Sequence, residues 1–174
     1  MKKITMLFVV MAMFALTANA QKKEQMYVGG TLGFAVQNQS VKDYSATATA
    51  FSIAPEFGYF VADNIKVGAE LDYSISGGSH TFLVMPNVAY YLPIVDKLYY
   101  TPQFSVGGGL GATSGYTKGA FALSLNVASI EYQPVENMAI SMSLVDLSYS
   151  YMAKVNGVGF SFLASPKVGF RYYF

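Results

Sequence analysis

Few residues in this chain of 174 are of the types that carry out chemistry. There is no cysteine, and the one histidine is His80, in the run Ser79-His80-Thr81. Nucleophilic catalysis needs a base held beside the nucleophile by a third group, and a lone histidine beside a serine in a polar stretch is usually a solvated residue. A transition-metal site needs several His or Cys ligands. We therefore predict no catalytic residue, no metal site and no cofactor-binding residue.

A glycine-rich run, Gly107-Gly108-Gly109-Leu110-Gly111, is followed by Thr113, Ser114 and Lys118, the composition of a phosphate-binding loop. The run lacks the Gly-Lys-Ser/Thr order of such a loop, and no helix pattern follows it. Glycines on a strand that faces a crowded interior, followed by a loop, explain the run better.

Charged residues are scarce. Asp, Glu, Lys and Arg make up 12% of the chain, about half of the ~25% that is usual in soluble domains, whereas 53% of the residues are hydrophobic. The 11 basic and 10 acidic residues nearly cancel. This composition excludes a disordered chain, a basic nucleic-acid-binding protein and a disulfide-stabilised scaffold.

The first twenty residues have the pattern of a secretory signal. They begin with Lys2 and Lys3, continue as an apolar stretch from Ile4 to Leu16, and end on Ala18-Asn19-Ala20. The apolar stretch is shorter than the ~20 residues that a membrane-spanning helix needs, which argues against an uncleaved anchor. We predict a signal peptide over residues 1–20, read at Ala18 and Ala20 and cut before Gln21, and one domain over residues 21–174.

After residue 20, apolar residues recur at every second position, which is the period of a β-strand. In one such segment Ile65, Val67, Ala69, Leu71, Tyr73 and Ile75 alternate with Lys66, Gly68, Glu70, Asp72 and Ser74. A soluble β-sandwich would carry charge on its outer face, whereas the polar face here is mostly Gly, Ala, Ser and Thr. Small and polar residues on one face and large apolar residues on the other are typical of a barrel whose apolar face meets lipid.

Turn signals divide the chain into eight strands, near residues 26–36, 48–61, 65–75, 81–92, 98–110, 119–133, 138–151 and 159–174. The connections alternate between tight turns, at 62–64, 93–97 and 134–137, and longer polar or glycine-rich loops, at 37–47, 76–80, 111–118 and 152–158. Lipid offers no hydrogen-bond partner to an open sheet edge, so the sheet must close. The predicted fold class is all-β, an eight-stranded antiparallel up-and-down transmembrane β-barrel.

A short repeat supports this topology. Pro55-Glu56-Phe57-Gly58-Tyr59, Pro86-Asn87-Val88-Ala89-Tyr90 and Pro166-Lys167-Val168-Gly169-Phe170 share one pattern, each on a strand that runs toward a tight turn or the carboxyl terminus. Because proline cannot donate to a ladder, we expect a bulge or an unpaired position at each. The apolar alternation slips by one residue within 119–133 and again within 138–151, which predicts a bulge in each of these strands.

The last seven residues, Val168-Gly169-Phe170-Arg171-Tyr172-Tyr173-Phe174, resemble the carboxyl-terminal signal of bacterial outer-membrane barrels. With the signal peptide and eight strands, the whole mature chain resembles small OmpA/OmpX-like outer-membrane β-barrels. The resemblance implies location in the bacterial outer membrane, and recognition of Phe170, Tyr172 and Phe174 by the barrel-assembly machinery. Because the chain ends at the barrel, without a peptidoglycan-binding domain, no cell-wall tether is expected.

The alternation directs most of the charged strand residues into the barrel. An eight-stranded barrel is just wide enough for its interior to be filled by side chains, and buried charges must be paired. We therefore predict a polar network in the lumen; the alternative is a narrow conduit for small solutes or ions, in which the excess of carboxylates would favour cations. The lumen residues are Glu56, Lys66, Glu70, Asp72, Glu131, Asp146, Lys167 and Arg171.

The function expected from these observations is that of a small, non-catalytic outer-membrane barrel, with a structural role or a surface-interaction role through four outer loops. Its expected partners are outer-membrane lipid and lipopolysaccharide, and not nucleic acid, and it is expected to be a monomer. A porin-like channel is the main alternative. A lipid-modifying enzyme is the second, but the local motifs of the similar barrel enzymes, the lipid A palmitoyltransferase and deacylase, are absent around His80.

Overall fold

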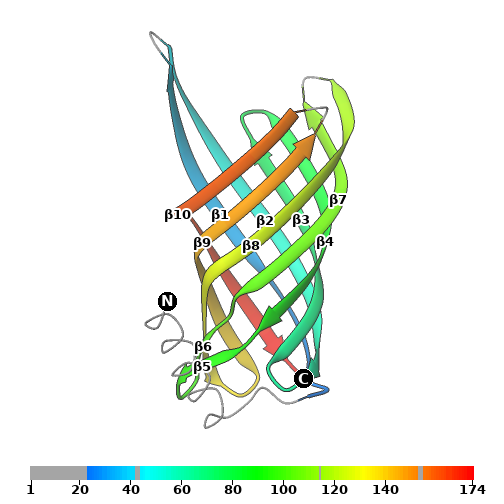
Figure 1. Cartoon of the computed structure of the whole chain (residues 1–174), viewed down its shortest axis with the longest axis vertical. Coiled ribbons are helices and arrows are strands. Elements are labelled where there is room, and N and C mark those ends of the chain that lie inside the picture. Colours follow the sequence, from blue (N-terminus) through cyan, green and yellow to red (C-terminus); the bar gives the residue numbers. More distant parts are fainter. Residues whose placement is uncertain (1–22, 42–43, 114, 153–154) are drawn as a thin grey trace, which may run out of the picture.

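The computed structural model describes residues 23–41, 44–113, 115–152 and 155–174. The predicted signal peptide, with its cleavage site at Ala18, Ala20 and Gln21, lies outside these residues. The chain winds as antiparallel strands around a single lumen (Figure 1). Within the described ranges, no helix is both long enough and apolar enough to cross a membrane.

The strands share one sheet. They are β1 (Met26–Val41), β2 (Tyr44–Ala62), β3 (Ile65–Ser76), β4 (Ser79–Tyr90), β5 (Leu92–Val95), β6 (Leu98–Tyr100), β7 (Gln103–Thr113), β8 (Tyr116–Val135), β9 (Met138–Met152) and β10 (Val155–Tyr173).

Eight of these strands form a closed ring. The hydrogen-bonded order is β8-β7-β4-β3-β2-β1-β10-β9. Pairing of β9 with β8 closes it, so none of the eight is an edge strand. The remaining two strands, β5 and β6, form a small hairpin between β4 and β7, and β6 pairs with the lower part of β8. The predicted eight-stranded antiparallel barrel is confirmed.

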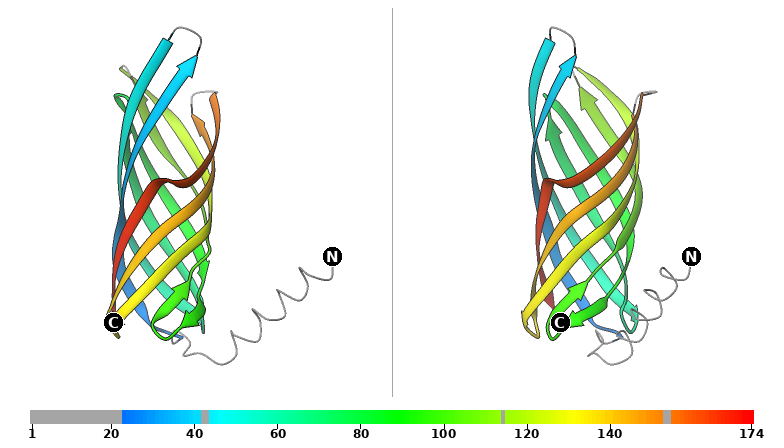
Figure 2. Two further views of the ribbon diagram at one scale, coloured as in Figure 1. Left: turned by 90° about the vertical axis from the view of Figure 1, so that its left-hand side faces the viewer. Right: turned by 60° about the vertical axis from the view of Figure 1, so that its left-hand side comes forward.

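The barrel has two different ends. The turns at residues 63–64, 96–97 and 136–137 lie at one end together with Met26 and Phe174; we call this the turn end, and it is at the bottom of Figure 1. The opposite end, which we call the hairpin end, carries longer β-hairpins. Figure 2 shows the β1–β2 hairpin rising beyond the others.

Two predicted boundaries were wrong near the β5–β6 hairpin. The segment 98–110 is not one strand, because it is interrupted at Thr101-Pro102, and the strand predicted over 81–92 ends at Tyr90. Proline has no N–H to donate, so a ladder cannot run through Pro102 unbroken. Backbone hydrogen bonds from Tyr90 N to the Pro102 carbonyl (3.1 Å) and from Thr101 N to the Ser129 carbonyl (2.8 Å) hold the wall together across the interruption.

The predicted loops at the hairpin end were too long. Pairing between β1 and β2 continues to Val41 and Tyr44, and pairing between β7 and β8 continues to Thr113 and Tyr116. Antiparallel hairpins satisfy their own backbone groups as far as a tight turn allows. Gly115, with a φ of 85°, lies in such a turn, and a positive φ suits glycine.

Unpaired positions occur at the prolines, as predicted. Pro55 pairs with Gly30 on β1, but the β2–β3 ladder skips it. Pro86 pairs with Ala69 on β3, but the β4–β7 ladder skips it. The third proline of the repeat lies in an irregular stretch of β10 between Phe162 and Lys167. Pro55 and Pro86 therefore turn their donor-free sides toward a gap in the ladder.

The predicted bulges in the sixth and seventh strands of the ring are also confirmed. The β8–β9 register shifts at Val127 on β8 and at Leu144 on β9, each of which is an extra residue in its strand. A bulge leaves backbone groups out of the ladder. At β8 the hydroxyl of Tyr100 donates to the Val127 carbonyl, so this group has a partner in the barrel wall.

Replacing Tyr100 by Phe should therefore destabilise the barrel by about 1–2 kcal/mol, because an unsatisfied carbonyl in a low-dielectric surrounding costs its desolvation energy. Urea unfolding in lipid vesicles, followed by the gel mobility of unboiled samples, measures the loss. Tyr132→Phe, an outward tyrosine with 48% exposure, is the matched control and should cost little. Equal stability of both variants would contradict the role of Tyr100.

Candidate functional site in the barrel interior

A layer of aromatic rings fills the lumen at the turn end. We call Tyr27, Phe60, Tyr91, Tyr99 and Tyr173 the aromatic layer; all are at most 7% exposed. The Phe60 and Tyr91 ring centroids are 5.0 Å apart and those of Tyr27 and Tyr173 are 5.8 Å apart. Rings at these separations are in the range of favourable aromatic packing.

The period-two alternation did not predict this layer, because it places large apolar side chains on the lipid-facing side. The available signal was a set of adjacent aromatic pairs at the turn end. In Tyr90-Tyr91 and Tyr172-Tyr173 the first residue is at least 40% exposed and the second is fully buried. Successive side chains of a strand point to opposite faces, so each pair supplies one ring to the outside and one to the lumen.

Four of the predicted lumen charges meet directly above the aromatic layer. We call Glu56 on β2, Lys66 on β3, Glu131 on β8 and Arg171 on β10 the ion network. Lys66 Nζ is 2.7 Å from Glu56 Oε1, Arg171 Nη2 is 3.0 Å from Glu56 Oε2, and Arg171 Nη1 is 2.5 Å from Glu131 Oε2. Two cations and two carboxylates form a neutral set, which is what burial of charge requires.

Hydroxyl groups join the aromatic layer to the ion network. The Tyr27 hydroxyl donates to Glu56 Oε1 (2.6 Å) and the Tyr91 hydroxyl donates to Glu131 Oε2 (3.1 Å). Tyr173 also donates to Glu131. The two sets of side chains are therefore one hydrogen-bonded unit, which we call the plug.

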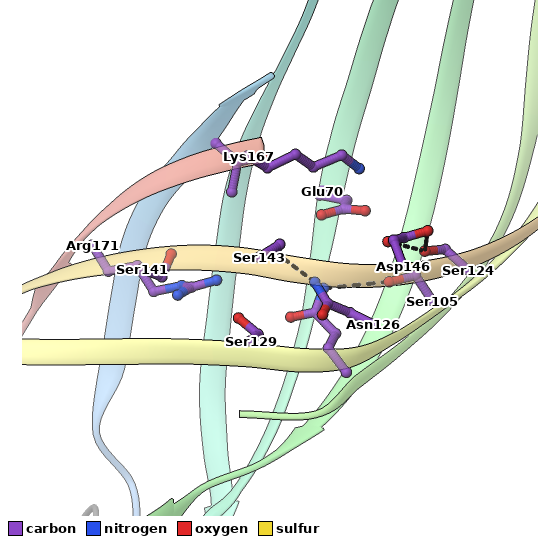
Figure 3. Close-up of a pocket in the computed structure, with 12 residues that line it drawn as sticks. Glu70, Ser105, Ser124, Asn126, Ser129, Ser141, Ser143, Asp146, Lys167 and Arg171 are labelled. Carbon is purple, nitrogen blue, oxygen red and sulfur yellow. Dashed lines mark hydrogen bonds between the residues drawn. The ribbon is translucent and has the colours of Figure 1, made fainter. Parts of the chain in front are cut away.

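The other four predicted lumen charges do not join the ion network by any ion pair in the described part of the chain. Glu70, Asp146 and Lys167 line a cavity of about 40 Å³ on the hairpin side of the network, and Asp72 lies half-buried farther along β3. In Figure 3 Glu70 and Lys167 point toward each other, and Asp146 accepts a hydrogen bond from Ser124 (3.0 Å).

Serine hydroxyls supply much of the remaining wall of this cavity, from Ser105, Ser124, Ser129, Ser141 and Ser143. A polar cavity needs roughly 10–15 Å³ for each water molecule, so this one has room for a few. We call it the vestibule. Short hydroxyl side chains thus line the vestibule, whereas long side chains and rings fill the turn end.

His80 lies at the hairpin end, outside the lumen. Its Nδ1 atom is 2.9 Å from the Tyr73 hydroxyl, and the neighbouring Ser79 donates to Thr113 rather than to the imidazole. The described residues contain no cluster of three or more His, Cys, Asp or Glu side chains that could hold a metal ion.

The outer surface of the barrel is a belt of exposed apolar side chains. Leu32, Phe57, Leu71, Val84 and Ile140, from five different strands, are each 43–53% exposed. The predicted assembly-signal residues Phe170, Tyr172 and Phe174 also point outward and are 44–60% exposed. Exposing such a surface to water is energetically unfavourable, whereas contact with the hydrocarbon of a bilayer is favourable.

Comparison with known proteins agrees with this surface. A profile of the outer membrane protein β-barrel domain matches residues 6–173. The chain belongs to this family. It is a small β-barrel protein of the bacterial outer membrane, and in such barrels the short turns face the periplasm.

Two solved barrels share its fold. The amino-terminal barrel of Pseudomonas aeruginosa OprF is 12% identical, with a TM-score of 0.52, 88% of this chain and 100% of that one being covered. Neisserial surface protein A is 16% identical, with a TM-score of 0.54 and coverage of 90% and 100%. No curated protein matches the sequence.

The position of the Tyr27 ring depends on Gly58, its partner across the β1–β2 ladder. A Cβ atom at Gly58 would overlap the Tyr27 ring. Gly58→Ala should therefore destabilise the barrel by about 1–3 kcal/mol, the usual cost of overpacking, measured by urea unfolding in vesicles. Gly108→Ala is the control, because the nearest atom to its added Cβ would be 3.4 Å away. If both substitutions have the same effect, the Tyr27 ring does not need this space.

Proposed function

We propose that this outer-membrane protein is a closed, non-catalytic barrel with a structural role, which meets its surroundings through the hairpins at its outer end. The observation that carries the proposal is the plug. Tyr27, Tyr91, Tyr173, Lys66 and Glu131 are all fully buried within the lumen. Side chains packed to this degree leave water and solutes no path through the turn end.

The ion pairs of the plug also argue against passage of a solute through the barrel. A solute that crossed the barrel would have to part Arg171 from its two carboxylates, and these groups would then be buried without partners. Removing one partner from a buried pair typically costs about 3–5 kcal/mol. The rings below would also have to leave their packed positions. Both barriers are in series along the lumen.

Planar-bilayer recordings test the proposal. The refolded protein should give no stable conductance steps. A variant that shortens both barriers, with Phe60→Ala and Tyr91→Ala in the aromatic layer and Glu56→Ala and Lys66→Ala in the ion network, should produce steps, which shows that the assay detects an opened lumen. Stable conductance by the unchanged protein would contradict the proposal in favour of the channel alternative. Such a channel should prefer cations, because Glu70, Asp72 and Asp146 outnumber Lys167.

The proposal excludes a lipid-modifying activity. His80 has a tyrosine, and not a serine or a carboxylate, as its described hydrogen-bond partner, so it lacks the companions that nucleophilic catalysis needs. A changed lipid A mass on overexpression, abolished by His80→Ala, would contradict this.

We further propose that the apolar belt contacts outer-membrane lipid and lipopolysaccharide, that the protein is a monomer, and that the barrel-assembly machinery recognises Phe170, Tyr172 and Phe174. The outward exposure of these three residues supports their recognition before the strand meets lipid. Unimpaired membrane insertion of a Phe174→Ser variant would argue against it.

A further inference from the structure

The seam between the first and last strands is the joint that closes the barrel. Here Tyr27–Gly33 of β1 pair with Tyr173–Lys167 of β10, a ladder of seven residue pairs. On its other side, β1 pairs with β2 over sixteen residue pairs, Met26–Val41 with Tyr59–Tyr44. Backbone hydrogen bonds between Met26 and Phe174 extend this joint by one pair. The first strand is therefore held to the last over half the length that it is held to β2.

One side chain crosses this seam inside the lumen. Arg171 on β10 reaches past β1 to Glu56 on β2, with Nε at 3.2 Å and Nη2 at 3.0 Å from Oε2. In the other direction Arg171 reaches past β9 to Glu131 on β8. No other ion pair spans the seam among the side chains that the structure describes.

Strand β1 also contributes to this crossing. The Tyr27 ring lies with its centroid 5.7 Å from the Arg171 guanidinium carbon and 5.8 Å from the Tyr173 ring. Its hydroxyl donates to the same Glu56 that Arg171 binds. The inward face of the last strand, Arg171 and Tyr173, thus holds the first two strands at once.

We propose that Arg171 is the residue that locks the barrel shut. Before the seam closes, Arg171 has only Glu131 on its own side, across β9, and Glu56 has only Lys66. Closure brings this guanidinium to Glu56 as well, in a lumen where charge-assisted hydrogen bonds are strong. Closure of the ring and completion of the plug are then a single event. This inference concerns assembly and does not depend on whether the lumen conducts.

Crosslinking across the seam during refolding tests the proposal, and the chain is suited to it because it contains no cysteine. Leu32 and Val168 face each other in the β1–β10 ladder and are both outward and about half exposed. In a Leu32→Cys/Val168→Cys protein refolding into lipid vesicles, the rate of linking by a short thiol-reactive crosslinker reports seam closure.

Arg171→Leu should slow this crosslinking by at least about tenfold. The substitution removes the ion pair that crosses the seam and leaves Glu56 and Glu131 without their arginine partner. Lys66→Met is the matched control. It removes another buried cation from the same Glu56, but Lys66 lies on β3, the neighbour of β2 on the side away from the seam. Its rate should stay within about twofold of the parent, because the seam tie remains in place.

Two results would overturn the proposal. One is crosslinking of the Arg171→Leu protein at the parent rate. The other is equal slowing by Lys66→Met, which would mean that the lumen needs charge balance rather than a tie at the seam.

A second measurement covers the case in which Arg171→Leu does not fold. The two cysteines are linked first in denaturant, and the linked chain is then refolded. If Arg171 acts by closing the seam, the link should restore the gel mobility of the folded barrel. Failure of the linked protein to fold would also overturn the proposal.

Discussion

The bond between the Arg171 guanidinium and the carboxylates of Glu56 and Glu131 is the interaction on which the rest of the structure depends. A guanidinium presents donors in a planar fork, so one side chain can serve two carboxylates at once. Here it draws β2, β8 and β10 toward one point of the lumen. Lys66 makes the set neutral, and the tyrosine hydroxyls below satisfy acceptors that the cations leave. Charge that would be costly to bury unpaired is thereby used to fill the lumen.

The scarcity of charge and the excess of apolar residues are two aspects of the same architecture. Lipid surrounds the wall, so the large apolar side chains face outward, and the few charges of the spanning strands are placed inward where they can pair. The two bulges keep this division. At Val127 and Leu144 each strand gains one residue, so apolar side chains on both sides of the bulge point to lipid. Without them, half of β8 would present Ser129 and Glu131 to hydrocarbon.

Much of the fold could be predicted because its signals are local. Period-two alternation located the strands, a slip in that period located the bulges, and the repeated prolines indicated gaps in the ladder. The break at Thr101-Pro102 and the length of the hairpins were not predictable in this way, because pairing with a neighbour decides where a strand ends. For the site, the alternation directed eight charges inward, but it could not say which would meet. That depends on side-chain length and on height along the axis, which brought Arg171 to Glu56 and left Lys167 with the vestibule.

We propose that the lumen is closed at the plug and that polar molecules reach the vestibule from the hairpin end. Thiol accessibility along the inward face of β9 tests it most directly. Ser143 lines the vestibule, and Ala139 is fully buried beside the aromatic layer. With a small charged thiol reagent added on the hairpin side, Ser143→Cys should be labelled and Ala139→Cys should not be. Labelling of both at similar rates would mean that water passes the plug, and the account would be wrong.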